Sequence, residues 1–352
     1  MIDELKNKRI LVTGHTGFTG SWASIWLNQI GAQVFGYSLP PETTPNLYTE
    51  AFVREIVTGI EGDIRDFDSL KAAFLEFQPE LVLHLAAQPL VRRSYRIPRE
   101  TFDVNAQGSA NVLEAARLTP SVKGILCITT DKVYKNDDSG VPFVETDELG
   151  GDDPYSASKA AAEVIIASYR KSFSVSETHS PLIAVARGGN IIGGGDWSED
   201  RLIPDAIRAF FSHEPLEIRS PNSTRPWQHV LSLVEGYIYI LSGLIGHKKE
   251  TFAQAFNLGP IDSEPVSVKV LLEQIQGSLP GLKVTYRQAD LHEAKLLSLN
   301  SNLAIETFGW QQKWTAEQSI QKTVDWYKNF YAKPSGARQL CLDQIDSWNK
   351  GI

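Results

Sequence analysis

The first half of the chain alternates short apolar runs with longer mixed stretches. The apolar runs are typical of buried strands, and they occupy residues 10–12, 33–37, 81–85, 124–129 and 182–186. The mixed stretches between them are predicted as helices, over residues 21–29, 68–77, 105–117 and 156–173. Strands that alternate with helices indicate parallel β-α-β units. The pattern therefore predicts an α/β fold with a Rossmann-type, doubly wound parallel sheet.

The pattern changes after Arg187, where two glycine-rich segments follow at 188–190 and 193–197. The helices predicted beyond them are irregularly spaced, at 204–211, 230–244 and 266–278. We expect a second, smaller mixed α/β domain that binds the substrate and is interleaved with the first. The first domain is assigned to residues 1–187 plus about 228–262, and the second to about 188–227 plus 263–352. For the polar tail after Pro334, a docked helix and an extension both remain open.

Size and composition exclude several classes of protein. The 352 residues allow a large core. A net charge of -8 disfavours nucleic acid as a partner. Cys127 and Cys341 lie too far apart in the sequence for a disulfide framework or a zinc site, so no metal is expected. No apolar run approaches the ~18 residues of a membrane span, and the N-terminal segment does not resemble a signal peptide. We therefore expect a soluble cytoplasmic protein with no membrane partner.

Tyr155 and Lys159 form the most informative pair of the sequence. They are four residues apart on a predicted helix, so both side chains lie on one face. A free phenol has a pKa of about 10 and is protonated at neutral pH. A neighbouring ammonium favours the phenolate, and the tyrosine can then act as a base. The pair predicts an enzyme that oxidises an alcohol.

Three glycines follow the first predicted strand and open the first predicted helix. Gly14 permits a tight turn, Gly17 lets the backbone approach a pyrophosphate, and Gly20 permits close packing of the helix on the strand. The spacing is GxxGxxG rather than GxGxxG, and a purely structural turn is the alternative for this pattern alone. The flanking strand and helix favour a dinucleotide site.

The residues that follow the next strands favour NAD over NADP. No acidic residue ends the second strand, and no Lys or Arg occurs between Ile10 and Val53, so a 2′-phosphate would find no local cation. Asp63 and Ile64 follow a third predicted strand and are expected to flank the adenine. The small residues after the strand at 81–85 suit close passage of the dinucleotide.

Thr130, Asp131 and Lys132 end the strand at 124–129. In open α/β sheets, ligands bind beyond the carboxyl ends of the strands, so these polar residues are placed for chemistry. A loop of solvated charges is the alternative. An ammonium with a pKa of about 10.4 is a poor base at pH 7, so Lys132 would need burial or a neighbouring cation such as Lys159 to act as one. Lys132 could instead only pair with a carboxylate.

Together these segments resemble the extended short-chain dehydrogenases that act on nucleotide sugars, and the CDP-glucose 4,6-dehydratases in particular. The resemblance spans about residues 8–330, and its motifs are at 14–18, 85–92, 130–132, 155–159, 187–190, 193–197 and 225–229. Its most specific marks are the loop at 193–197 and Lys132, where the dTDP-glucose relatives typically carry glutamate.

The resemblance implies an internal redox cycle that yields CDP-4-keto-6-deoxyglucose. Tyr155 would take the O4 proton while the C4 hydride passes to NAD, and Thr130 and Lys159 would hydrogen-bond the phenolate or the sugar hydroxyl. Lys132 would remove the C5 proton and Asp131 would protonate the departing C6 hydroxyl. The hydride then returns to C6. The product would feed 3,6-dideoxyhexoses of surface polysaccharide, such as a lipopolysaccharide O-antigen.

The resemblance also implies the binding residues. Those expected at the cofactor are Gly14, Thr16, Gly17, Phe18, Thr19, Gly20, Ser38, Asp63, Ile64, Leu85, Ala86, Ala87, Gln88, Asn105, Tyr155 and Lys159. Those expected at the substrate are Gln88, Arg92, Asn190, Arg201, Leu202, Arg219, Arg225, Asn257, His292 and Glu293. Arg201, Arg219 and Arg225 are the candidates for a diphosphate, because the guanidinium binds phosphate in bidentate fashion. His15, His84 and His229 are interpreted as structural.

Two other functions remain open. A nucleotide-sugar 4-epimerase needs Tyr155 and Lys159 but no acid/base pair for elimination, and Asp131–Lys132 disfavours it. A dehydratase that acts on a dTDP-, GDP- or UDP-linked sugar instead of CDP-glucose also remains open. A non-catalytic NAD(H)-binding regulator is disfavoured because Thr130, Tyr155 and Lys159 are all present. The resemblance implies a homodimer built on the helices that carry Asn105 and Tyr155, with a tetramer as the alternative.

Overall fold

A seven-stranded parallel sheet forms the centre of the computed structural model, which describes residues 2–173, 180–218, 221, 223–260, 266–287 and 297–351, with the backbone alone at Arg225. The strand order is β3-β2-β1-β4-β5-β6-β11. The strands are β1 (Arg9–Thr13), β2 (Gln33–Ser38), β3 (Thr58–Glu61), β4 (Leu81–His84), β5 (Gly124–Thr130), β6 (Leu182–Gly188) and β11 (Ala255–Leu258). The chain leaves β1 toward one edge and returns to β4 on its other side, so the predicted doubly wound sheet is confirmed.

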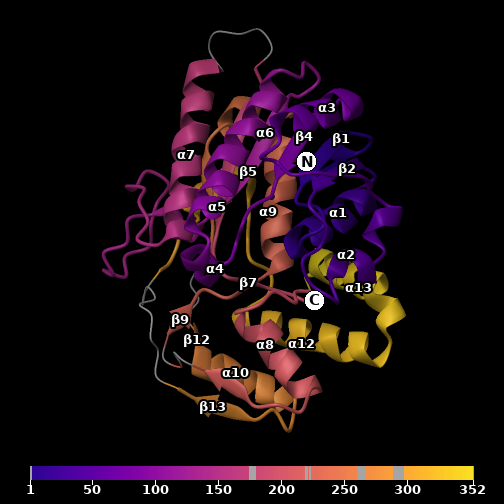
Figure 1. Cartoon of the computed structure of the whole chain (residues 1–352), viewed down its shortest axis with the longest axis vertical. Helices are drawn as coiled ribbons and strands as arrows, with labels where there is room; N and C mark the ends of the chain where they lie inside the picture. The colour runs from indigo at the N-terminus through magenta and orange to yellow at the C-terminus, as the bar shows by residue number, and fades with distance from the viewer. Residues whose placement is uncertain are drawn as a thin grey trace.

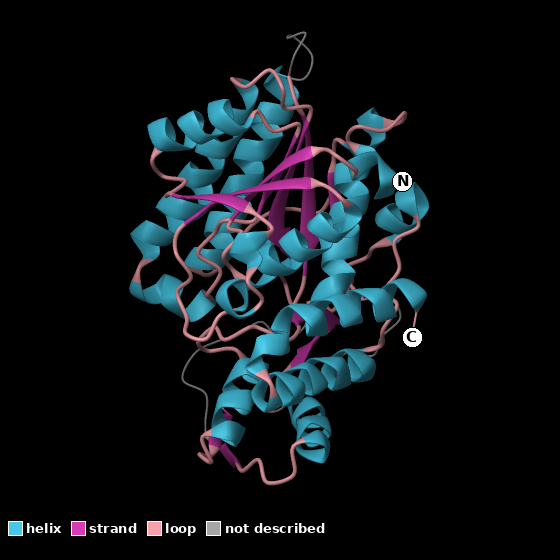
Figure 2. Ribbon diagram, turned by 90° about the vertical axis from the view of Figure 1, so that its right-hand side faces the viewer, coloured by secondary structure: helices cyan, strands magenta, loops and turns pink. Residues whose placement is uncertain are grey.

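Helices cover both faces of the sheet (Figures 1 and 2). Ile10 and Val12 of β1 pack into one apolar cluster and Leu11 into the other, as expected for a strand buried on two sides. On the first face lie α1 (Phe18–Ile30) and α9 (Val230–Gly243). On the second face lie α3 (Phe67–Phe77), α6 (Gly108–Arg117) and α7 (Pro154–Phe173).

The predicted strands match β1, β2, β4, β5 and β6 to within two residues at each end. The helix predicted over 105–117 is divided instead. Pro98 begins α5 (Pro98–Phe102), a π-helical turn η3 (Asp103–Gln107) follows, and α6 starts at Gly108. Proline suits the first turn of a helix because its missing N–H has no partner there in any case. The other short elements are η1 (Ile2–Leu5), α2 (Leu47–Glu50), η2 (Val53–Glu55), α4 (Val91–Arg96), η4 (Asp131–Val133), η5 (Lys249–Phe252) and η6 (Pro334–Gly336).

A smaller mixed α/β region lies beyond the carboxyl ends of the strands (Figure 1). Its helices are α8 (Leu202–Phe211), α10 (Val268–Ser278) and α12 (Ala316–Ala332), whereas α11 (Asn302–Phe308) packs beside the central sheet, where Phe308 contacts Tyr239 and Phe256. Its strands form the pairs β8 (Leu216–Ile218) with β13 (Val284–Tyr286), β9 (Thr224–Arg225) with β12 (Val266–Ser267), and β7 (Ile191–Ile192) with β10 (Gln228–His229). The exact domain boundaries stay a prediction. Among the described helices, none is long and apolar enough to cross a bilayer.

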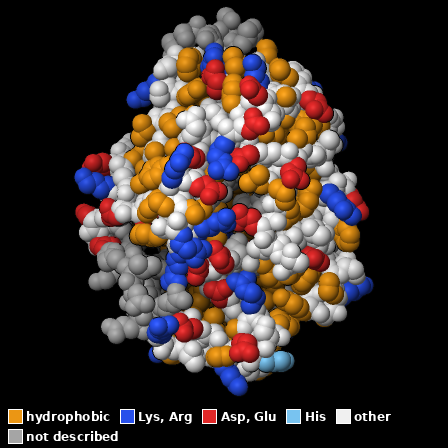
Figure 3. Space-filling model, viewed as in Figure 1, with side chains coloured by type: hydrophobic (Ala, Val, Ile, Leu, Met, Phe, Trp, Pro, Cys, Tyr) orange, Lys and Arg blue, Asp and Glu red, His pale blue; other side chains and the backbone are white. Residues whose placement is uncertain are grey.

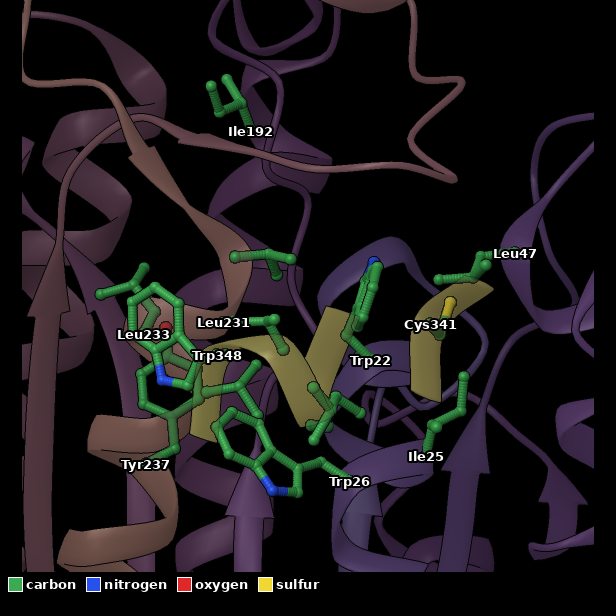
Figure 4. Packing of buried hydrophobic residues seen from close by; sticks show 14 of the residues in the cluster. Trp22, Ile25, Trp26, Leu47, Ile192, Leu231, Leu233, Tyr237, Cys341 and Trp348 are labelled. Carbon is green, nitrogen blue, oxygen red and sulfur yellow. The ribbon is translucent and has the colours of Figure 1, made fainter. Parts of the chain in front are cut away.

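The tail that the sequence left open is a docked helix, α13 (Ala337–Lys350). It lies against α1 and α2, so this part of the chain contacts helices that we assigned to the first domain, although we assigned the tail to the second. Cys341 lies among Trp22, Ile25 and Leu47 (Figure 4). The Trp348 ring meets Trp314 edge to face, with ring centres 5.0 Å apart. Because the sequence of the tail is mainly polar, its few fully buried residues were not enough to predict a docked helix.

Replacing Trp348 with alanine tests this docking. We expect Trp348→Ala to lower the free energy of unfolding by ~3–5 kcal/mol, because a large buried aromatic side chain is lost. Asn349→Ala is the matched control, since Asn349 is the next residue and exposed. Chemical denaturation measures both. Equal stability of the two variants would contradict a docked tail.

Candidate functional site

A cavity of about 1740 Å³ lies between the carboxyl ends of the strands and the smaller region. Basic and acidic side chains gather around a hollow in the middle of the face drawn in Figure 3. The cavity is lined by all five predicted catalytic residues and by every predicted cofactor residue except Asn105. The predicted substrate residues that line it are Gln88, Arg92, Asn190, Arg201 and Leu202. Arg219, His292, Glu293 and the side chain of Arg225 lie outside the described part of the structure.

The glycine turn has the geometry of a phosphate cradle. Gly14 has a φ of +75°, and a Cβ on it would lie 2.8 Å from the backbone nitrogen of Ala86. A Cβ on Gly20 would lie 2.1 Å from the carbonyl oxygen of Gly14. Gly17 is the N-cap of α1 and provides no side-chain cap, so the first N–H groups of the helix remain available to an anion. These features fit a bound pyrophosphate.

The residues beyond β2 and β3 form the expected adenosine end of the cavity. The Thr16 hydroxyl lies 2.8 Å from the Ser38 hydroxyl and donates to the Leu39 carbonyl. The Asp63 carboxylate accepts from Arg65 Nε and Nη2, and this pairing lowers the pKa of the Asp63 carboxyl. Sequence reasoning missed Arg65 because it searched for cations only along the second strand.

Asn105 was predicted to contact the cofactor, but it does not line the cavity. It is buried, it accepts a hydrogen bond from the Gln88 backbone nitrogen at 2.9 Å, and it donates to the Gln88 carbonyl at 3.1 Å and to Ser158. The side-chain amide of Gln88 is itself bonded to Leu90 and Thr101. Asn105 therefore positions the loop after β4, and Gln88 of that loop lines the cavity.

The predicted acid/base residues form one contiguous group at the end of β5. Thr130 Oγ1 donates to Asp131 Oδ1 at 2.9 Å and accepts from the Lys132 backbone nitrogen at 3.3 Å. Lys132 Nζ lies 3.4 Å from Asp131 Oδ1. Asp131 is buried, and its Oδ2 has no hydrogen-bond partner. The side chain of Lys132 is 30% exposed, so it is not buried as Asp131 is.

Tyr155 and Lys159 enter the same group from the first turns of α7. The backbone nitrogen of Tyr155 donates to Ser94 Oγ at 3.2 Å, which ties α4 to the start of this helix. Burial raises the pKa of Tyr155 to about 12, and the neighbouring Thr130 hydroxyl opposes that shift only in part. Burial lowers the pKa of Lys159 to about 8, and its ammonium donates to the Ile128 carbonyl at 3.0 Å. The expected lowering of the tyrosine pKa by Lys159 is therefore not seen in this arrangement.

Two arginines predicted to bind the substrate line the cavity, and each is paired with a carboxylate. Arg92 Nη1 lies 3.2 Å from Asp200, and Arg201 Nη1 lies 2.9 Å from the buried carboxylate of Asp196. Asn257 was predicted as a substrate residue, but it is fully buried and does not line the cavity. Its amide accepts from the Tyr134 hydroxyl and donates to the Phe143 carbonyl, so its bonding is structural.

The three histidines that we interpreted as structural are all buried. His84 Nδ1 lies 2.8 Å from the Thr13 hydroxyl and Nε2 lies 2.9 Å from Ser109. Burial lowers the pKa values of His84 and His229 to about 3 and that of His15 to about 4, so all three are neutral near pH 7. Within the described residues, no group of His, Cys, Asp or Glu side chains could hold a metal ion.

The fold and the site are those of a dinucleotide-binding enzyme with a tyrosine–lysine pair beside an acid/base pair. The chain belongs to the family described as GDP-mannose 4,6 dehydratase, whose model matches residues 11–323. It is 39% identical to the CDP-glucose 4,6-dehydratase of Salmonella typhimurium over 336 aligned residues. The aligned region covers 93% of each chain. It is 26% identical to the dTDP-glucose 4,6-dehydratase of Xanthomonas campestris, over 90% of this chain and 92% of that one.

Solved structures share the fold. The dTDP-glucose 4,6-dehydratase of Bacillus anthracis in complex with NAD aligns with a TM-score of 0.77 at 24% identity, over 93% of this chain and 98% of the other. The UDP-glucose 4-epimerase of Thermus thermophilus in complex with NAD aligns with the same TM-score of 0.77 at 24% identity, over 91% and 99%. Because dehydratases and epimerases align equally well, the fold alone does not choose between them.

Two alanine substitutions in the glycine turn separate packing from cofactor binding. Gly17→Ala should leave the melting temperature near that of the wild type, because its Cβ would lie 3.4 Å from the Gly14 carbonyl oxygen. It should still weaken NAD binding about tenfold, or ~1.4 kcal/mol, because the methyl group enters the space of the pyrophosphate. Gly20→Ala should lower both stability and affinity, since α1 must move. Calorimetry and thermal unfolding measure both effects, and unchanged NAD binding by Gly17→Ala would refute the cradle.

Proposed function

We propose that this protein dehydrates CDP-D-glucose to CDP-4-keto-6-deoxy-D-glucose in an NAD-dependent reaction. The observation that carries the proposal is that Asp131 and Lys132 lie together beside Tyr155 and Lys159 in the cavity that also contains the glycine cradle. One pair serves an oxidation and the other an elimination. The 39% identity to a CDP-glucose 4,6-dehydratase over 93% of the chain supports the nucleotide.

The cofactor we propose is NAD, which supplies hydride acceptance and return when bound. Gly14, Gly17 and Gly20 would hold its pyrophosphate, and Ser38 and Asp63 would lie at its adenosine. Arg65 and Arg93, the cations near that end, are each bonded to a carboxylate, Asp63 and Glu42 respectively. A 2′-phosphate would have to displace those carboxylates, which supports NAD over NADP.

Tyr155 is the proposed base for the O4 proton of the sugar. The phenol is buried beside Thr130, so its surroundings restrict the position of its oxygen. Its ionisation inside the protein requires a nearby positive charge, and Lys159 is one turn away on the same helix. Thr130 would hydrogen-bond the phenolate or the sugar hydroxyl. These roles are those of a general base and its electrostatic support.

Asp131 and Lys132 are the proposed acid and base of the elimination. C5 and C6 of the sugar are adjacent atoms, so groups that serve both must themselves be adjacent, and Lys132 Nζ lies 3.4 Å from Asp131 Oδ1. Oδ2 of Asp131 is buried and has no hydrogen-bond partner, and we assign it the transfer of a proton to the C6 hydroxyl. Lys132 would remove the C5 proton that the 4-ketone makes acidic.

We further propose a homodimer, with a tetramer as the alternative, formed through the layer of α5, α6 and α7. Val164 on α7 is 61% exposed and Phe102 on α5 is 39% exposed, which is apolar area that a second copy could cover. A cytoplasmic location and a role in making 3,6-dideoxyhexoses of surface polysaccharide, such as an O-antigen, follow from the same resemblance. The net charge of -8 supports a partner set without nucleic acid.

An isotope experiment tests the reaction. CDP-glucose labelled with deuterium at C4 should yield a product that carries deuterium at C6 and is lighter by one water. In heavy water, solvent deuterium should appear at C5, because a side chain exchanges that proton. CDP-, dTDP-, GDP- and UDP-glucose are compared under the same conditions, and the CDP sugar should give the highest kcat/KM. Return of the label to C4 with inverted configuration would assign the chain to the epimerases.

Replacing Lys132 separates elimination from oxidation. Lys132→Ala should form the reduced cofactor, seen by its absorbance at 340 nm, but release keto-deoxy sugar at least ~100-fold more slowly, because general-base catalysis is lost. Lys135→Ala is the control, since Lys135 is exposed and pairs with Glu148 at 3.1 Å. If Lys132→Ala fails before any absorbance appears at 340 nm, Lys132 acts in binding or in the first step instead.

A further inference from the structure

A buried ion pair lies directly behind the reacting residues. Arg187 at the end of β6 donates from Nε and Nη2 to the two oxygens of Glu163 on α7, at 2.8 and 2.5 Å. The Thr129 hydroxyl, at the end of β5, donates to Glu163 Oε1 at 2.7 Å. The side chains of Arg187 and Glu163 are 5% and 4% exposed. One carboxylate thus joins two neighbouring strands to a single helix.

The same ion pair extends to the far edge of the sheet. Arg187 Nη1 donates to the Tyr134 hydroxyl at 2.6 Å and to the Glu145 carbonyl at 2.9 Å, and its guanidinium lies over the Tyr134 ring, 4.9 Å from the ring centre. Tyr134 donates in turn to Asn257 of β11 at 2.7 Å. The carboxyl ends of β5, β6 and β11 are therefore connected by one hydrogen-bonded network.

Both halves of the catalytic group are attached to this network. Glu163 follows Lys159 by one turn of α7 and Tyr155 by two turns. Thr129 immediately precedes Thr130, and Tyr134 follows Lys132 by two residues. The network therefore fixes the distance between the helix that provides the tyrosine–lysine pair and the strand end that provides the acid/base pair.

Stability alone does not account for the pair. Removing two charges from water costs several kcal/mol per ion, and well-packed apolar residues often replace a buried ion pair without loss of stability. We propose that Glu163 is a positioning residue for the reaction, which holds the end of β5 against the Tyr155 helix through Thr129 and Arg187. This proposal rests on the proposed function, because the residues it positions are those of that reaction.

Glu163 also acts on the charge of Lys159. The titratable groups around that ammonium are His84 on β4, Cys127 on β5, and Tyr155 and Glu163 on α7, with Arg187 on β6 behind Glu163. Burial lowers the pKa of Lys159 to about 8, and the negative charge of Glu163 opposes that shift. Burial raises the pKa of the Cys127 thiol to about 12 and lowers that of His84 to about 3, so both are neutral near pH 7.

The sign of the pH effect follows from this arrangement. Lys159 is charged below its pKa and loses its proton as the pH rises through it. A glutamine at 163 keeps hydrogen-bonding atoms but removes the negative charge, which lowers the pKa of Lys159 further. As the pH rises, Lys159 of this variant therefore loses its proton at a lower pH than in the wild type, and it stops stabilising the Tyr155 phenolate from that pH upward.

The experiment measures kcat and KM for CDP-glucose as a function of pH, with NAD present, for the full-length protein. Glu163→Gln should reduce kcat with little change in KM, and the alkaline limb of kcat should move about one unit to lower pH. Glu163→Asp keeps the charge, so its limb should stay in place while kcat falls. Glu114→Gln removes a carboxylate from an ion pair with Arg117 on α6 and should behave as the wild type.

The outcomes separate the two proposals. A wild type that turns over no nucleotide sugar overturns the proposed function. An active wild type whose Glu163→Gln variant keeps the same alkaline limb, or whose Glu114→Gln control moves it equally, overturns the role of Glu163. If Glu163→Gln does not fold, Thr129→Val carries the test. Because Thr129→Val leaves the charge of Glu163 in place, a lower kcat of this variant with an unchanged alkaline limb supports the positioning role. A kcat equal to that of the wild type refutes it.

Discussion

The parallel order of the strands is the constraint on which the site depends. Because every strand of the sheet runs the same way, every carboxyl end lies on one edge, and the residues that follow the strands meet there. Gly14 follows β1, Ala86 follows β4, Thr130 ends β5 and Gly188 ends β6. The crossing of the chain from β1 to β4 leaves a crevice at this edge, and the glycine turn opens directly into it.

Charge at the cavity is balanced before any ligand enters. Arg92 is held by Asp200 and Arg201 by Asp196, while Asp63 holds Arg65. A diphosphate that binds these arginines must replace carboxylates as their partners. When a phosphate replaces a carboxylate, the arginine keeps an anionic partner. Recognition of the diphosphate therefore depends on geometry and on the bidentate fit of phosphate to the guanidinium.

Local sequence patterns predicted the elements but not the partners of their side chains. The apolar runs identified β1, β2, β4, β5 and β6, and the glycine spacing identified the cradle, since both signals are contained in a few consecutive residues. Asn105 and Asn257 were predicted as ligand contacts, and the structure gives their amides to neighbouring backbone and side chains instead. A sequence does not reveal which polar group a distant segment will satisfy. Glu163 was missed for the same reason, because its partner Arg187 lies on another element.

The pKa values at Tyr155 and Lys159 explain why a buried charge network is retained near the reaction. Burial gives the site its low dielectric, which strengthens every electrostatic interaction inside it. The same burial raises the pKa of the phenol to about 12 and lowers that of the ammonium to about 8, so each group is driven toward its neutral form. Proton transfer needs the opposite, a phenolate beside an ammonium. A carboxylate one turn beyond Lys159 opposes the loss of the lysine proton, and Arg187 prevents that carboxylate from being unpaired. In the proposed reaction, the ion pair would therefore keep Lys159 charged beside Tyr155 although both side chains are buried.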